Sequence, residues 1–146
     1  MHRIHVNFYI NAPVERVFDA MADHEHFFRG GAIRSARVVR QGEGERNGKG
    51  AVREIHASGL RFLEEITCFE RPSRFDYQIT ECTIPVNHEG GQLHFIDRGA
   101  GTEIDWISDY EIPIPLVGKP MEEFFERVFV TEFTRLTLQA KAELEG

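Results

Sequence analysis

The chain has 146 residues, the length of about one domain. Hydrophobic residues make up 41% of it and charged residues 28%, a balance that excludes both a disordered tail and a fibrous repeat. The formal net charge of −7 at pH 7 provides no long-range attraction to nucleic acid or to anionic lipid surfaces. We therefore expect one compact domain over residues 1–146 that does not bind nucleic acid.

The sequence also lacks the signals that direct a chain into or across a membrane. No apolar run approaches the roughly 18 residues that span a bilayer, and Met1 to Asn7 hold no apolar segment before a cleavage site. These features predict a cytoplasmic protein with no transmembrane segment. Cys68 and Cys82 are expected as free thiols, because that compartment is reducing and because the register derived below places Cys68 beside Phe75.

The first elements are a strand and a short helix. Apolar and polar residues alternate strictly over Ile4–Ile10, which predicts a half-buried strand. Pro13 and Glu15 then stand where the first turn of a helix favours them. The apolar residues that follow recur at helical spacing up to Met21, so a short helix is expected here.

A second short helical turn is expected over 23–29, ended by two glycines, and a strand is expected over 33–41. The glycine-rich stretch 42–50 then predicts a mobile connection between two strands. It lacks the lysine and hydroxyl spacing of a phosphate-binding loop, so we assign it no ligand.

Residues 51–82 predict three strands whose apolar residues share one face. A two-residue turn at Ser58 and Gly59 joins the first two strands. The expected pairs are Ala57–Leu60, Ile55–Phe62, Arg53–Glu64 and Ala51–Ile66 in the first hairpin, and Cys68–Phe75, Ile66–Tyr77, Glu64–Ile79 and Phe62–Glu81 in the second. A slip of one residue would bring charged residues onto the apolar face, so the pattern itself selects this register.

The last part of the sheet is expected to follow an exposed loop over 84–91. Strands over 93–97 and 102–112 form a hairpin around a glycine-rich turn, which pairs Phe95 with Ile104. The pairing of Leu93 with Trp106 follows from the same count. The inward-facing set of the last strand is Thr102, Ile104, Trp106, Ser108, Tyr110 and Ile112.

The chain ends in a long amphipathic helix. Pro120 can occupy the first position of a helix, and the acidic residues Glu122 and Glu123 complement the dipole there. From Met121 to Leu144 apolar residues recur every three or four positions. This spacing predicts one helix of about 25 residues.

The order of these elements predicts an α+β fold, with a seven-stranded antiparallel sheet, two short helices after the first strand and one long C-terminal helix. Only the long helix can form a second layer, so the sheet must wrap around it. Strands about 4.8 Å apart make such a sheet too wide for a helix of about 10 Å diameter to cover. The expected result is a hollow interior between sheet and helix.

Three stretches of the sequence carry a family resemblance. They are NAPVERVF at 11–18 followed by DHE at 23–25, FLEEIT at 62–67, and GTEIDW at 101–106. In this order the chain resembles the START-related SRPBCC superfamily, which includes polyketide cyclases and dehydrases, lipid-transfer domains and plant pathogenesis-related proteins. The resemblance implies the helix-grip (Bet v 1-like) fold around a hydrophobic cavity, and it leaves the ligand open.

Arg53 and Glu64 are the most informative pair of residues. The expected register places them opposite each other on the apolar face, where an unpaired charge would cost several kcal/mol. They should therefore pair with each other or touch water in a cavity. One interpretation is a polar anchor for a ligand carbonyl, hydroxyl or carboxylate, and the other is an ion pair that only sets the register of the sheet.

The other candidates for the pocket wall share the inward face. The tyrosine and tryptophan rings offer broad apolar surfaces with a polar group that needs a partner, although ordinary core packing is the alternative for each of them. The predicted ligand-binding residues are Arg53, Ile55, Phe62, Glu64, Ile66, Tyr77, Ile79, Phe95, Trp106, Ser108, Tyr110, Phe125 and Phe129.

The histidines and hydroxyl groups form no recognisable catalytic set. His24 and His26 are two residues apart, which directs them to different faces of a helix, so no metal site is expected. His88 is placed in the loop over 84–91, where it either borders the cavity mouth and protonates a ligand or is simply solvated. Ser108 faces inward, but no histidine has a register beside it. We therefore predict no metal, no cofactor and no assigned catalytic residue.

Three functions fit these observations. The first is binding of a small hydrophobic molecule, such as a polyketide, an aromatic or a lipid-like compound, in the cavity. The second is a polyketide aromatase/cyclase or dehydrase, in which Arg53 or a tyrosine stabilises an enolate and Glu64 moves protons. The third is a regulatory or partner-binding module whose mouth loops, 85–91 and 113–120, change when the cavity fills. The sequence indicates neither the ligand nor the oligomeric state.

Overall fold

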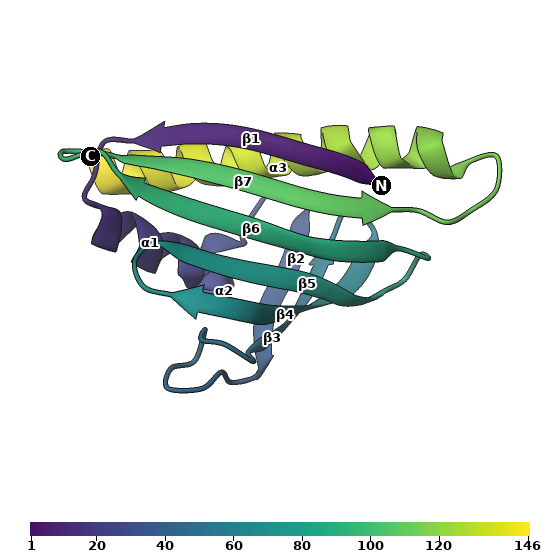
Figure 1. Cartoon of the computed structure of the whole chain (residues 1–146), viewed down its shortest axis with the longest axis horizontal. Coiled ribbons are helices and arrows are strands. Elements are labelled where there is room, and N and C mark those ends of the chain that lie inside the picture. The colour runs from purple at the N-terminus through teal and green to yellow at the C-terminus, as the bar shows by residue number, and fades with distance from the viewer.

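The computed structural model describes residues 1–146 and shows a seven-stranded antiparallel sheet curled around a long helix (Figure 1). The strands are β1 (His2–Ile10), β2 (Ile33–Arg40), β3 (Val52–Ala57), β4 (Leu60–Glu70), β5 (Arg74–Cys82), β6 (Asn87–Asp97) and β7 (Thr102–Glu111), and the helices are α1 (Val14–Ala22), α2 (His24–Phe27) and α3 (Gly118–Glu145). Their order across the sheet is β1-β7-β6-β5-β4-β3-β2. The predicted α+β architecture is confirmed.

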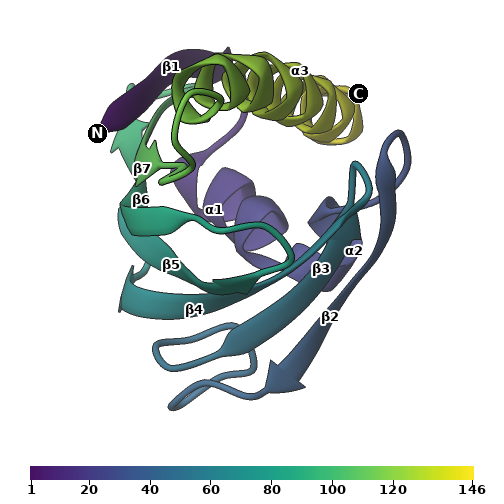
Figure 2. The same cartoon turned by 90° about the vertical axis from the view of Figure 1, so that its right-hand side faces the viewer.

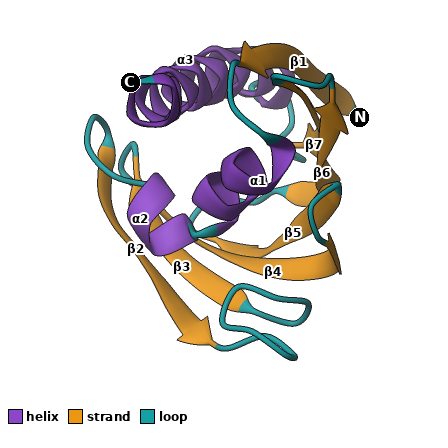
Figure 3. Ribbon diagram, turned by 90° about the vertical axis from the view of Figure 1, so that its left-hand side faces the viewer, coloured by secondary structure: helices purple, strands orange, loops and turns teal.

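The β1–β7 side of the curled sheet lies against the long helix, and the other side curves away from it. α3 packs mainly against β1, β7 and α1 (Figure 2). α1 and α2 lie across one end of the curled sheet, where α1 contacts β6 and α2 contacts β2 (Figure 3). None of the three helices combines the length and the apolar composition that crossing a membrane requires.

The β3–β4 hairpin has the predicted register. Ser58 and Gly59 have φ values of 53° and 77°, the left-handed conformations that a two-residue type I′ turn requires at both positions. Arg53 of β3 therefore faces Glu64 of β4. Because side chains alternate along a strand, Arg53 points into the molecule and Glu54 points out of it.

The β4–β5 hairpin has the predicted register only in its middle. The observed pairs are Phe62–Cys82, Glu64–Ile79, Ile66–Tyr77, Cys68–Asp76 and Phe69–Phe75. The prediction is wrong where it placed Phe62 opposite Glu81 and Cys68 opposite Phe75. Two bulges cause the difference, because each leaves one residue unpaired and shifts the register beyond it by one position. Cys68 and Cys82 are free thiols at different ends of this hairpin.

The stretch 84–91 is not the exposed loop that its composition predicts, because β6 already begins at Asn87. Gly91 is a strand residue that pairs with Ser108 of β7. A Cβ atom at this position would lie 2.0 Å from the Tyr77 ring. The glycine that suggested a loop is therefore needed for another reason: it lets a tyrosine of β5 lie across the backbone of β6.

The connection 42–50 joins β2 and β3, as predicted, and side-chain contacts link it to two other segments. Arg46 donates to Glu25 of α2, with 2.8 Å between Nε and Oε1. Arg71 donates to Glu45, with 2.6 Å between Nη2 and Oε1. The connection is therefore tied to α2 on one side and to the β4–β5 turn on the other.

α3 begins at Gly118, two residues before the predicted start at Pro120, and has 28 residues. In the first turn of a helix the backbone N–H groups lack intrahelical partners, so a proline at the third position loses no hydrogen bond. Phe133, Leu136 and Ala140 are buried, whereas the earlier apolar residues Phe125 and Phe129 are only half-buried. The N-terminal half of the helix thus leaves part of its apolar face uncovered by the sheet.

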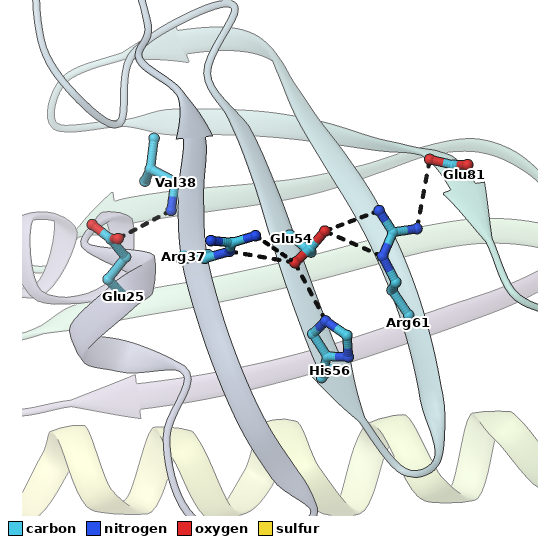
Figure 4. Close-up of polar contacts among 7 residues, drawn as sticks. All are labelled: Glu25, Arg37, Val38, Glu54, His56, Arg61 and Glu81. Atoms are coloured by element: carbon cyan, nitrogen blue, oxygen red, sulfur yellow. Dashed lines mark hydrogen bonds and ion pairs between the residues drawn. The ribbon is translucent and has the colours of Figure 1, made fainter.

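The outward face of β2, β3 and β4 carries a network of charged side chains (Figure 4). Glu54 lies at its centre and accepts hydrogen bonds from Arg37 at 3.1 Å, from Arg61 at 2.9 Å and from His56 at 3.3 Å. Arg61 also forms an ion pair with Glu81. These hydrogen bonds hold the pKa of the Glu54 carboxyl below its usual range.

Candidate functional site

The curled sheet and α3 enclose a cavity of about 130 Å³. A single buried water needs only about 10–15 Å³, so the cavity has room for a larger molecule. Of the 29 residues that line it, 23 are hydrophobic. The hollow apolar interior that the sequence predicts is therefore present.

The opening of the cavity lies between α3 and the far half of the sheet. Lining residues that are half-buried mark this opening, since they contact both the cavity and solvent. They include Phe28 after α2, Leu60 and Phe62 of β4, Ile84 and Val86 between β5 and β6, and Phe125, Phe129 and Glu132 of α3. A molecule would enter between α3, the β3–β4 turn and the β5–β6 connection.

The structure brings ten of the thirteen sequence-predicted site residues to the cavity wall. They are Ile55, Phe62, Glu64, Tyr77, Ile79, Trp106, Ser108, Tyr110, Phe125 and Phe129. Arg53, Ile66 and Phe95 are buried but do not line the cavity. Phe95 packs edge-to-face against Phe18 of α1, with ring centroids 5.0 Å apart. Whether the ten wall residues contact a ligand stays a prediction.

Arg53 and Glu64 form a buried ion pair, with 2.8 Å between Arg53 Nη2 and Glu64 Oε1. The Arg53 side chain has no exposed surface, and its Nε and Nη1 atoms have no hydrogen-bond partner. Burial raises the pKa of the Glu64 carboxyl, and the adjacent guanidinium acts in the opposite direction. Of these two partners only Glu64 lines the cavity, and the Arg53 guanidinium lies behind it.

Tyr77 and Trp106 form a second polar contact in the wall. The Trp106 Nε1–H group donates to the Tyr77 hydroxyl oxygen over 2.8 Å. Burial and the charge of Glu64 raise the pKa of the Tyr77 phenol, so it stays protonated at neutral pH. On its other side the Trp106 ring stacks on Phe133 of α3, with centroids 4.4 Å apart, and so connects the sheet to the helix.

His88 corrects two predictions at once. It lies within β6 and is buried, so it is neither a loop residue nor solvated. Its Nε2 atom is 2.9 Å from Ser108 Oγ, although the predicted register left Ser108 with no histidine beside it. The bulge between His88 and Gly90 explains the difference, because it turns His88 to the inward face. Burial lowers the pKa of His88 to about 4, so the ring is neutral at pH 7.

His24 is a further buried polar lining residue that sequence reasoning missed, and Ser58 and Glu132 line the cavity as well. His24 is buried at the start of α2, and its Nδ1–H donates to the Ala22 carbonyl oxygen over 2.9 Å. Burial, together with the charge of Arg53, lowers its pKa well below the usual range. The remaining ring nitrogen, Nε2, therefore carries a free lone pair. No signal in the sequence separated this histidine from His26, which is exposed.

Tyr110 lines the cavity and contacts the buried Glu122 near the start of α3. The Tyr110 hydroxyl donates to the Glu122 carbonyl oxygen, and the Glu122 carboxylate accepts from the Ile112 N–H over 2.9 Å. Burial raises the pKa of the Tyr110 phenol. No group of three or more His, Cys, Asp or Glu side chains is arranged to hold a metal ion.

The comparison with protein families matches residues 1–145 to the family described as polyketide cyclase / dehydrase and lipid transport. No curated protein matches the chain. Among solved structures, a protein from Nitrosospira multiformis is similar at 22% identity, with a TM-score of 0.69 over 98% of this chain and 96% of that chain.

Two further solved structures show the same fold. A START superfamily protein from Mycobacterium smegmatis has 12% identity and a TM-score of 0.74 over 99% of this chain and 98% of that chain. Norcoclaurine synthase from Thalictrum flavum, in complex with dopamine and hydroxybenzaldehyde, has 13% identity and a TM-score of 0.70 over 98% of this chain and 85% of that chain. At such identities the likeness concerns the fold alone.

Proposed function

Because the chain belongs to the polyketide cyclase / dehydrase and lipid transport family, we propose that it binds a small, mostly apolar molecule in the cavity between its sheet and α3. The observation that carries this proposal is the composition of the wall, in which 23 of 29 residues are hydrophobic. Burial of apolar ligand surface contributes about 25 cal/mol per Å². The few polar groups, chiefly Glu64 and Tyr77, would orient the ligand.

A pair of neighbouring tryptophan substitutions tests the location of the site. Ile79 lines the cavity, whereas Thr80 is exposed on the outward side. We expect Ile79→Trp to fill the cavity and to abolish binding of the neutral dye N-phenyl-1-naphthylamine, and Thr80→Trp to leave binding unchanged. Dye emission at increasing protein concentration measures both. Equal binding by the two variants would place the dye elsewhere and contradict the proposal.

The ligand itself can be sought directly. Native mass spectrometry of the freshly purified chain should show a second species, heavier by the mass of one small molecule. Ile79→Trp should lose this species and Thr80→Trp should keep it. A co-purified molecule that survives Ile79→Trp would be bound outside the cavity.

A second candidate function is catalysis on the bound molecule by a cyclase or dehydrase type of reaction. The observation that favours it is Glu64, whose carboxyl lines the cavity and whose pKa is raised by burial. Its Oε1 atom accepts from Arg53, while Oε2 has no hydrogen-bond partner in the protein. A carboxyl group in such a position can accept and return a proton at a carbon next to a ligand carbonyl.

Exchange of the methyl protons of 2-acetonaphthone into deuterated water, followed by NMR, tests this second function. Glu64→Gln should abolish any protein-catalysed exchange and retain binding of the ketone. Glu65→Gln is the matched control, because Glu65 lies on the outward face and pairs with Arg40. If the wild-type chain gives only the background rate, it acts on the molecule as a binding protein.

A further inference from the structure

A run of hydrogen bonds crosses β5, β6 and β7 on the cavity wall, and its donors all point in one direction. It begins at His88, where the backbone N–H of Ile79 donates to Nδ1 over 2.9 Å. Nδ1 must therefore carry a lone pair, and the hydrogen of the neutral ring lies on Nε2. Nε2–H then donates to Ser108 Oγ over 2.9 Å.

Tyr77 lies in the same wall as Ser108. The Ser108 hydroxyl lowers the pKa of the Tyr77 phenol, against the larger effect of burial. Trp106 Nε1–H, which can only donate, reaches the phenol oxygen over 2.8 Å.

The hydrogen of the Tyr77 hydroxyl group has no partner in the protein. Its oxygen accepts from Trp106, and the hydroxyl donates to no protein acceptor. Tyr77 lines the cavity. The ring is held in this orientation because Gly91 leaves the backbone of β6 bare beneath it. A fixed donor, polarised by the Trp106 N–H group behind it, therefore faces the ligand space.

The charge of Glu64 decides which kind of acceptor can occupy this place. The Glu64 carboxylate lines the same wall, and its charge acts on the Tyr77 phenol. Arg53, its counter-ion, does not reach the cavity. A second anion beside Tyr77 would meet the Glu64 charge directly, whereas Arg53 acts on this place more weakly from behind the wall.

We propose that Tyr77 is a specificity-determining residue whose hydroxyl donates to an uncharged carbonyl oxygen of the ligand, so that the cavity selects apolar ketones or aldehydes over hydrocarbons and carboxylates. This inference rests on the proposed function, since it requires that the cavity take up an apolar molecule. It adds the chemical class of that molecule and the residue that recognises it.

Three probes of matched shape separate the classes: 2-acetonaphthone, 2-ethylnaphthalene and 2-naphthoate. Calorimetric titration at pH 7 should show the ketone binding tightest to the wild-type chain. Tyr77→Phe should weaken the ketone about fivefold, the equivalent of one net hydrogen bond of about 1 kcal/mol, and should leave the hydrocarbon unchanged. Tyr9→Phe is the matched control, because Tyr9 is half exposed and lies outside the cavity.

The outcomes distinguish this inference from the proposed function. If neither the ketone nor the hydrocarbon binds the wild-type chain, the proposed function fails. If both bind and Tyr77→Phe weakens both equally or neither, only the inference is overturned. Tighter binding of 2-naphthoate than of the ketone would overturn it as well. Unchanged binding of 2-ethylnaphthalene by Tyr77→Phe shows at the same time that the variant is folded.

A spectroscopic readout tests the hydrogen bond itself. The carbonyl stretching band of ¹³C-labelled 2-acetonaphthone should move to lower frequency on binding to the wild-type chain, because donation from Tyr77 weakens the C=O bond. In Tyr77→Phe the bound band should return to the position that it has in an apolar solvent. Ser108→Ala should give an intermediate position. An identical band in wild type and Tyr77→Phe would overturn the proposal.

Discussion

Arg53 and Glu54 are neighbours in β3, and each forms an ion pair, but they lie on opposite faces of the sheet. Arg53 is fully buried and has one partner, Glu64. Glu54 accepts from three side chains on the outward face, chiefly from Arg61. The pKa of the outward Glu54 is lowered by its partners, whereas the pKa of the inward Glu64 is raised by burial.

This difference shows that an ion-pair partner does not by itself determine the pKa of a carboxyl group. On the outward face water solvates the charges and several donors surround one acceptor. On the inward face one donor must offset the loss of water around two charges, and the desolvation is the larger effect. Such an ion pair beside a cavity fits the proposed role of Glu64 as a polar group that orients the ligand.

Removal of the cation on each face is expected to give the largest contrast. Arg53→Met leaves the buried Glu64 without a partner and should lower the free energy of unfolding by about 3 kcal/mol. Arg61→Met leaves Glu54 with Arg37 and with water, so its effect should be several times smaller. Urea denaturation at pH 7 measures both. Equal losses would break the contrast between the two faces.

The inward-facing His88 is expected to make the protein sensitive to acid. Its pKa is lowered to about 4, so between the ordinary value of about 6.5 and this value the unfolded chain binds a proton that the folded chain does not. The free energy of unfolding should therefore fall as the pH falls through this window, by about 3 kcal/mol from this residue. The free energy of unfolding of His88→Asn should depend less on pH in this acidic range. An unchanged pH dependence would mean that His88 is not buried.

Two glycines allow the same clash to be created on either face. A Cβ atom at Gly91 would meet the Tyr77 ring inside the molecule, and a Cβ atom at Gly101 would meet the Tyr9 ring outside it. Gly91→Ala should cost about 1–3 kcal/mol and should alter the fluorescence of Trp106, because the buried ring has nowhere to move. Gly101→Ala should cost less, since Tyr9 can turn into solvent. Thermal unfolding and emission spectra measure the pair, and a larger loss for Gly101→Ala would reverse our assignment.

The smallest expected effect is an opposite pH dependence of the stability contributed by two glutamates. The raised pKa of Glu64 gives a contribution to stability that is present at low pH and is lost as the pH rises through that pKa. The lowered pKa of Glu54 gives a contribution that is present above the unfolded value and is lost as the pH falls through the folded one. Stability of Glu64→Gln and Glu54→Gln relative to wild type, followed across the acidic range, should change with opposite slopes. Slopes of the same sign would show that burial does not dominate at Glu64.

The sequence predicted the sheet, its curl around α3 and most of the cavity wall, because alternation and helical spacing specify which residues face inward. It placed Arg53 opposite Glu64 correctly, since the Ser58-Gly59 turn determines that register. It did not show that Arg53 lies behind the wall and only Glu64 reaches the cavity. That distinction depends on side-chain length and on the curvature of the sheet, which a pairing pattern does not contain.

The errors in the sequence interpretation come from bulges and from glycines. A bulge moves every later residue of a strand by one position relative to its partner, and nothing in the local sequence announces it. The composition of 84–91 predicts a loop for His88, whereas the bulge between His88 and Gly90 brings it to the inward face beside Ser108. Gly91 contributes to this loop prediction, although its role is to give the Tyr77 ring space.

Trp106 provides the most direct test of the cavity as a binding site, because it is the only tryptophan and lines the wall. Titration of the wild-type chain with N-phenyl-1-naphthylamine should quench Trp106 emission by energy transfer to the dye. We expect this quenching to saturate at one dye per chain, and 2-acetonaphthone to displace the dye. Emission that stays constant, or that declines without saturating as the dye accumulates, would contradict an internal ligand site.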